Sequence, residues 1–108
     1  MDKFSALADP TRREIIELLA KHGELAASEI GAHFSISAPA VSQHLKVLRQ
    51  VKLVRVERRA QQRIYRIEPD TLQDLADWAE RLTQLWTQRF DGIENILKSE
   101  QINGENDG

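Results

Sequence analysis

The chain has 108 residues, 41% of them hydrophobic, and a formal net charge of −2, which fits one globular domain with a modest core. It contains no cysteine, so disulfides, thiolate zinc sites and thiol redox switches are excluded. No apolar run is long enough to span a bilayer, and the start MDKFSALADP lacks the apolar core of a signal peptide, so we expect a cytoplasmic protein.

The first residues predict two helices. A short helix spans Phe4–Ala8. Asp9 is a good N-cap, and Pro10 follows at the first helical position, where its missing N–H costs nothing. The second helix therefore begins at Pro10, and Gly23 ends it in the C-terminal glycine role. The residues predicted to form its apolar face are Ile15, Ile16, Leu18 and Leu19.

The next segment predicts a helix-turn-helix. A helix over Ala27–Phe34 contains Gly31, which costs roughly 1 kcal/mol relative to Ala and predicts close approach of another helix. Ser35–Ser37 forms the turn, and Ser37 caps a further helix over Ala38–Gln50. Two short helices joined by three residues place the second in the position of a DNA-recognition helix. Its predicted inward residues are Val41, Leu45 and Leu48.

A β-hairpin follows, because the apolar period changes from helical spacing to alternation. The hairpin tip is predicted near Arg59–Gln62, where the glycine or asparagine of a tight two-residue turn is absent, so we expect a longer loop. One face is predicted to carry Val54, Val56, Tyr65 and Ile67, and the other Arg55 and Arg66.

The last predicted helix is long for a domain of this size. Pro69 ends the hairpin, Asp70 caps the helix, and the helix runs over Thr71–Lys98. Its apolar stripe is too wide to be buried against one small domain, which predicts a dimer. We expect residues 1–98 to form one DNA-binding and dimerisation domain, and the acidic segment 99–108 to be disordered.

Although the net charge is small, basic and acidic residues are concentrated in different segments of the chain. Residues 37–67 hold 8 basic residues and 1 acidic residue, a net charge of +7. Residues 68–108 hold 3 basic and 10 acidic residues, a net charge of −7. A basic block that begins at the helix-turn-helix is a candidate electrostatic footprint for nucleic acid. The other interpretation is a solvated basic face balanced by an acidic helix.

The order of these elements is that of a winged helix-turn-helix, mainly α with a small β-hairpin and a long C-terminal dimerisation helix. The sequence resembles the arsenic-repressor (ArsR) family of bacterial transcriptional regulators. The matching stretches are ALADPTRREIIELL, SEIGAHFSISAPAVSQHLKVLRQVKLV and RRAQQRIYRI, within residues 4–67. The resemblance implies a homodimeric repressor that binds an inverted-repeat operator of double-stranded DNA. It also implies that the first and last helices pair the subunits.

Metal sensors of that family carry a cysteine pair where this chain has Ala26 and Ser28, and the last helix here has no histidine. The resemblance is therefore to a metal-independent branch, and we expect neither a metal nor a cofactor. The three histidines also lack metal-ligand spacing. The chain has no glycine-rich phosphate loop and no HExxH motif, so we expect no catalytic residues and no enzyme activity.

Candidate DNA contacts lie on the recognition helix and the wing. Gln43 can pair with adenine, Ser42 and His44 can reach bases or phosphate, and the cations can neutralise phosphates. The residues predicted to bind DNA are Ser37, Ala38, Pro39, Ala40, Ser42, Gln43, His44, Lys46, Arg58, Arg59, Gln62 and Arg63.

The predicted dimer interface joins the first and last helices. Its residues are Phe4, Leu7, Leu75, Trp78, Leu82, Leu85, Trp86 and Phe90. The same aromatic stripe leaves open a small organic effector bound between the terminal helices. A rival function is a winged-helix protein-interaction module whose basic face docks an acidic protein.

Overall fold

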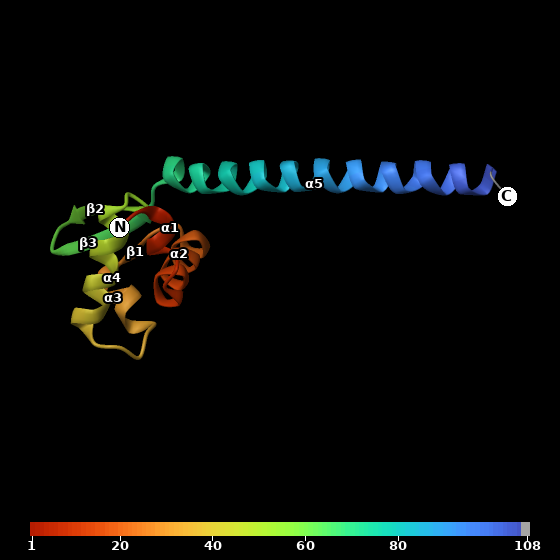
Figure 1. Ribbon diagram of the computed structural model, residues 1–108. Coiled ribbons are helices and arrows are strands. Elements are labelled where there is room, and N and C mark those ends of the chain that lie inside the picture. The colour runs from red at the N-terminus through yellow and green to blue at the C-terminus, as the bar shows by residue number, and fades with distance from the viewer. Residues whose placement is uncertain (107–108) are drawn as a thin grey trace. The chain divides into compact units, whose positions relative to one another are not determined.

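The computed structural model describes the backbone of residues 1–106 and the side chains of residues 1–97. Its elements, in chain order, are α1 (Lys3–Ala6), α2 (Pro10–His22), β1 (Leu25–Ala26), α3 (Ala27–Ala32), α4 (Ala38–Gln50), β2 (Val54–Arg59), β3 (Gln62–Ile67) and α5 (Pro69–Asn106) (Figure 1). The predicted fold class, a mainly helical winged helix-turn-helix with a long C-terminal helix, is confirmed.

Two predicted caps fix the starts of the longer helices in the winged domain. The carboxylate of Asp9 accepts a hydrogen bond from the N–H of Arg12 at 3.0 Å, and Pro10 occupies the first turn of α2. The hydroxyl of Ser37 accepts a hydrogen bond from the N–H of Ala40 at 3.2 Å. Each cap satisfies a backbone donor that the helix itself leaves without a partner.

The sheet has three antiparallel strands in the order β1-β3-β2. Val54 pairs with Ile67 and Val56 with Tyr65, as the alternation predicted. The sequence did not predict β1, whose two residues, Leu25 and Ala26, pair with the opposite edge of β3. A strand of two residues is too short to show a period, so no pattern could have revealed it.

The hairpin tip corrects a second expectation. Arg59 pairs with Gln62, so the loop has only the two residues Ala60 and Gln61. Ala60 adopts a φ of 54°, a left-handed conformation that glycine or asparagine usually supplies at such a turn. The tight turn forms without the preferred residue, and the prediction of a longer loop is wrong.

The core lies where α2, α3 and α4 meet the sheet. No buried side chain is polar or charged among the described residues. The helix boundaries differ from the sequence by a few residues: α3 ends at Ala32 rather than Phe34, and the turn before α4 is correspondingly longer. The largest fully buried side chains are Ile15, Leu19, Ile30, Leu48, Leu53 and Val54.

The last helix begins at Pro69, so Asp70 lies in its first turn instead of capping it. It continues to Asn106, past the predicted end at Lys98. Each residue that extends a formed helix adds one backbone hydrogen bond without a new nucleation cost, so residues of low helix propensity can continue it. The predicted disorder of residues 99–108 stays a prediction, since the side chains of that segment lie outside the described residues.

The chain divides into two compact units, Met1–Gln73 and Asp74–Gly108. The first unit holds the winged helix-turn-helix, and the second consists of most of α5. The prediction of one domain over residues 1–98 requires a second copy to cover α5, and it stays a prediction. Among the described residues, none of the helices is long and apolar enough to cross a membrane.

Candidate nucleic-acid interface

The recognition helix α4 has one buried face and one polar face. Val41 and Leu45 are 4% and 2% exposed and anchor the helix on the core. On its other side Ser42, Gln43 and Lys46 are exposed. No hydrogen bond within the described part of the chain engages these three polar side chains. Their donors and acceptors are therefore available to a partner, as predicted for a helix that reads a groove.

The first turn of α4 presents backbone and small side chains. Ala38 and Pro39 are exposed and Ala40 is half-buried. The hydroxyl of Ser37 is already used in capping the helix. A turn without long side chains lets the backbone approach a surface closely, so these four predicted residues are suited to contacts with the sugar-phosphate backbone.

His44 occupies a different environment from its neighbours on α4. Its side chain is only 21% exposed, and its Nδ1 lies 3.2 Å from Nη1 of Arg12 and 3.9 Å from a carboxylate oxygen of Asp9. Because a guanidinium only donates, Nδ1 accepts this hydrogen bond. The structure thus places His44 against the start of α2, apart from the exposed polar group of α4.

Arg12 links three helices and was not among the residues predicted from the sequence. Its Nε donates to the carbonyl oxygen of Ala6 in α1 at 2.6 Å, while Nη1 reaches His44 in α4. The adjacent Arg13 donates to the carbonyl oxygen of Leu7 at 2.7 Å. Arg12 and His44 are 32 residues apart, and no local pattern signals such a contact.

The wing carries two cations directly opposite each other. Arg58 of β2 and Arg63 of β3 are cross-strand partners, so their side chains share one face of the hairpin. Both are exposed, and neither forms an ion pair with any residue whose side chain is described. Like charges directly opposite on a ladder are destabilising, so this face favours an external anion.

On the opposite face of the wing, Arg55 and Arg59 have acidic partners within the chain. Arg59 donates to both carboxylate oxygens of Glu24, at 2.6 and 2.9 Å, and to Glu57 at 3.0 Å. This hydrogen bonding lowers the pKa of the Glu24 carboxyl and raises that of the Arg59 guanidinium from its already high value. Arg55 pairs with Glu68 at 3.3 Å. Arg55 and Arg59 are therefore paired within the chain, whereas Arg66, the cross-strand partner of Arg55, is exposed and forms no ion pair with any side chain that the structure describes.

The sequence placed Arg59 with Arg58 and Arg63 as one group, and the structure separates them. Residues 58 and 59 are consecutive in a strand and point to opposite faces. Gln62 is the cross-strand partner of Arg59 and shares its face. The pairing of Arg59 with Glu24 joins residues 35 apart, so it could not be seen in the hairpin sequence.

The predicted interface residues of α5 expose large apolar surfaces. Trp78 and Leu82 are 45% and 47% exposed, and Trp86 is 69% exposed. The exposed stripe extends beyond the predicted set, to Ile93 and Leu97. Of the remaining predicted residues, Leu85, Phe90 and Phe4 are exposed, while Leu7 and Leu75 are half-buried. A stripe of this size on one helix is typical of a protein–protein contact.

No group of three or more histidine, aspartate or glutamate side chains in the described part of the chain is arranged to hold a metal ion. His33 instead lies 3.4 Å from Glu14 at the surface.

Comparison with protein families matches residues 9–56 to the family described as "Bacterial regulatory protein, arsR family". The matched segment runs from the cap of α2 through the recognition helix and into β2. It therefore contains the helix-turn-helix and the Arg12–His44 contact.

Two curated proteins extend the likeness. The transcriptional repressor SdpR of Bacillus subtilis is 41% identical over 75 residues, which cover 69% of this chain and 82% of that protein. The HTH-type transcriptional regulator Rv2034 of Mycobacterium tuberculosis is 41% identical over 97 residues, covering 90% of this chain and 87% of that protein. Among solved structures, the ArsR-like transcriptional regulator from Rhodococcus sp. RHA1 superposes with a TM-score of 0.71 at 30% identity, covering 86% of this chain and 87% of that one.

Proposed function

The chain belongs to the arsR family of bacterial regulatory proteins, a family of DNA-binding transcriptional regulators and not of enzymes, and from that premise we propose that it is a homodimeric repressor of an inverted-repeat operator whose binding needs no metal. Its place of action is the cytoplasm, where the operator is.

The observation that carries this proposal is the pair of opposed arginines, Arg58 and Arg63, on one face of the wing. Arg55 and Arg59 each have acidic partners within the chain, whereas Arg58 and Arg63 face each other without one. Two guanidiniums opposed on a two-stranded ribbon repel each other unless an anion lies between or above them. A DNA backbone supplies such anions at regular spacing, and Arg is suited to bind them bidentately.

The recognition helix supplies the sequence specificity in this proposal. Gln43 is exposed on α4, and its amide can donate to N7 and accept from N6 of adenine in the major groove. Ser42 and Lys46 flank it on the same exposed face and contact bases or phosphates. His44 holds the helix on α2 through Arg12 and reads no base.

The second copy in this proposal covers the apolar stripe of α5. Large residues recur at Leu75, Trp78, Leu82, Trp86 and Phe90, at intervals of three or four. Burying apolar side chains contributes about 25 cal/mol per Å² removed from water, so an aromatic stripe of this size favours association. A two-fold dimer would set the two recognition helices about 34–36 Å apart, one turn of DNA.

Metal independence follows in this proposal from the ligands available. Arsenite and structural zinc both favour thiolate, and the chain has no cysteine. The acidic residues of α5 offer only carboxylate oxygens, which suit harder cations. Control of repression therefore rests on an organic ligand, a partner or the amount of protein.

The test is a selection of duplex DNA by the full chain from a random pool, followed by binding titrations of the selected sequence. We expect an inverted repeat, bound by two copies, with an affinity that falls steeply as salt increases. Arg63→Ala should reduce the slope of log affinity against log salt by about one, while the matched variant Arg55→Ala leaves it unchanged.

Recovery of no preferred sequence would contradict the proposal and favour the protein-interaction module. Equal losses for Arg63→Ala and Arg55→Ala would show that the charge division of the wing does not determine DNA contact.

A further inference from the structure

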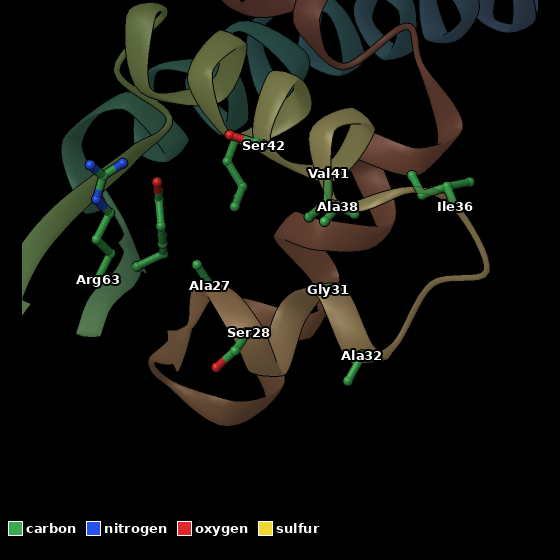
Figure 2. A pocket seen from close by; sticks show the side chains of 11 residues that line it. Ala27, Ser28, Gly31, Ala32, Ile36, Ala38, Val41, Ser42 and Arg63 are labelled. Atoms are coloured by element: carbon green, nitrogen blue, oxygen red, sulfur yellow. The ribbon is translucent and has the colours of Figure 1, made fainter. Parts of the chain in front are cut away.

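A partly open cavity of about 530 Å³ lies between α3, α4 and β3 of the wing (Figure 2). Its volume is within the range of 300–1,000 Å³ that is typical of small-molecule sites. Val41 and Leu45 of α4 and Tyr65 of β3 form its apolar surfaces, and each is at most 5% exposed. Ile36, which is 42% exposed, lies at the end of the cavity away from Arg63 (Figure 2).

Gly31 keeps this cavity open on the α3 side. The sequence predicted that another helix approaches Gly31 closely, and the structure contradicts this. A Cβ atom added at Gly31 would meet no atom within 4 Å, because the space in front of it belongs to the cavity. Glycine therefore has no packing reason here, although it is an unfavourable residue inside a helix.

Arg63 and Ser42 are two of the polar residues that line the cavity, together with Ser28 and Tyr65. Figure 2 shows Arg63 at the β3 side of the cavity and the hydroxyl of Ser42 on the α4 side facing it. Arg63 forms no ion pair, and Ser42 no hydrogen bond, with any side chain that the structure describes. A mostly apolar cavity whose one cationic side chain, Arg63, forms no ion pair, and whose other polar side chains carry hydroxyls, complements a molecule with an apolar body and a single anionic group.

We propose that this cavity binds a small organic anion with a planar apolar body, such as an aromatic carboxylate, and that the bound anion displaces DNA. The displacement part rests on the proposed function, because Ser42 and Arg63 are contacts for both ligands. A molecule that engages Arg63 and fills the space beside Ser42 removes one wing cation and one recognition-helix contact from DNA. The two ligands then exclude each other, and the anion lowers the apparent affinity for the operator.

The binding part is tested by NMR titration of the ¹⁵N-labelled full chain with naphthalene-2-carboxylate. The neutral naphthalene-2-methanol is the matched control ligand. We expect the carboxylate to shift amide signals of α3, α4 and β3, and to bind about tenfold more tightly than the alcohol. Arg63→Gln should remove this preference, and Gly31→Leu should fill the cavity and abolish the shifts while retaining the fold, since leucine is the better helix former.

The outcomes separate the two proposals. Signals that shift only in α5, or unchanged binding by Gly31→Leu, would overturn the cavity site, as would absence of binding by either compound up to about 1 mM. A chain that selects no DNA defeats the proposed function but leaves the NMR result intact. If DNA binds and saturating naphthalene-2-carboxylate leaves its affinity unchanged, the displacement part is wrong.

Discussion

Nη1 of Arg12 donates to Nδ1 of His44 across 3.2 Å, which joins the first turn of α2 to the recognition helix. Nε of the same guanidinium holds the last residue of α1 through the carbonyl oxygen of Ala6. Arg12, a side chain outside the helix-turn-helix, thus links α1 and α2 to the recognition helix.

This arrangement distinguishes His44 from its neighbour Gln43. Gln43→Ala should relax the base preference at one operator position, with a loss of about 1–3 kcal/mol on the selected sequence. His44→Ala should lower the free energy of unfolding by about 1 kcal/mol, through the lost hydrogen bond, and leave base preference unchanged. Selection from a random pool with each variant, and urea unfolding of each, make the measurement. A change of selected sequence for His44→Ala would show that its ring contacts a base.

Arg59 is expected to behave like the paired Arg55 and unlike Arg58 and Arg63. Its guanidinium is ion-paired with Glu24 and Glu57, whose carboxylates neutralise its charge, so a phosphate would gain little from contact with it. Arg59→Ala should therefore leave the salt dependence of DNA binding unchanged, whereas Arg58→Ala should reduce the slope by about one. Glu24→Gln releases one of the partners of Arg59, and the slope should then increase. The idea fails if Arg58→Ala and Arg59→Ala alter the slope equally.

Charge in the apolar stripe of α5 should prevent assembly. Trp86→Glu places a carboxylate in the proposed dimer interface, where an unpaired buried charge is strongly unfavourable. Sedimentation should then show a monomer, and operator affinity should fall because each half-site is bound alone. Gln88→Glu adds the same charge two residues away on the opposite side of the helix and should remain a dimer. A tight dimer of Trp86→Glu would place the interface elsewhere.

The cap of α2 predicts a pH dependence of stability. The N–H of Arg12 lowers the pKa of the Asp9 carboxyl below its ordinary value of 3.8. A carboxylate with a lowered pKa stabilises the folded state above that ordinary value, and the contribution is lost as pH falls through the folded pKa. Asp9→Asn keeps a capping side chain and removes the titration.

At neutral pH the unaltered chain should therefore be more stable than Asp9→Asn by about 0.5 kcal/mol, from the charge at the helix N-terminus. The difference should shrink in urea titrations as the pH falls below 3.8 and through the lowered pKa of Asp9. A difference that is constant over this range would mean that the Asp9 charge contributes nothing.

Regulation by metals should be absent. With no thiol in the chain, operator affinity should be the same with a chelator, with micromolar zinc and with arsenite. Titrations of one DNA duplex under each condition make the comparison. A change of about tenfold with either metal, about 1.4 kcal/mol of coupling, would reveal a metal site formed between the subunits.

The sequence predicted those features whose interactions join residues close together in the chain. Asp9 and Ser37 were recognisable as caps because each bonds an N–H three residues away. The contacts of Arg59 with Glu24 and of β1 with β3 join distant parts of the chain, and neither leaves a periodic signal. The left-handed Ala60 is opposed by local preference, and the sheet pairing on either side imposes it.

Gly31 was recognised as unusual, but the reason predicted for it was wrong. A glycine inside a helix is unfavourable, so it indicates that something other than helix propensity selects it. Whether a neighbouring helix or an empty cavity lies in front of it is decided by the tertiary structure. For the same reason, the sequence could list the cations of the wing but could not separate the paired from the unpaired ones.

The opposed Arg58 and Arg63 make dissolved salt act on the wing in two opposite directions. In the free protein, added ions screen the repulsion between the two guanidiniums and so stabilise the hairpin. In the proposed complex with DNA, the same ions compete with the guanidiniums for phosphate. Part of the loss of affinity at high salt would then be offset by a better-formed wing.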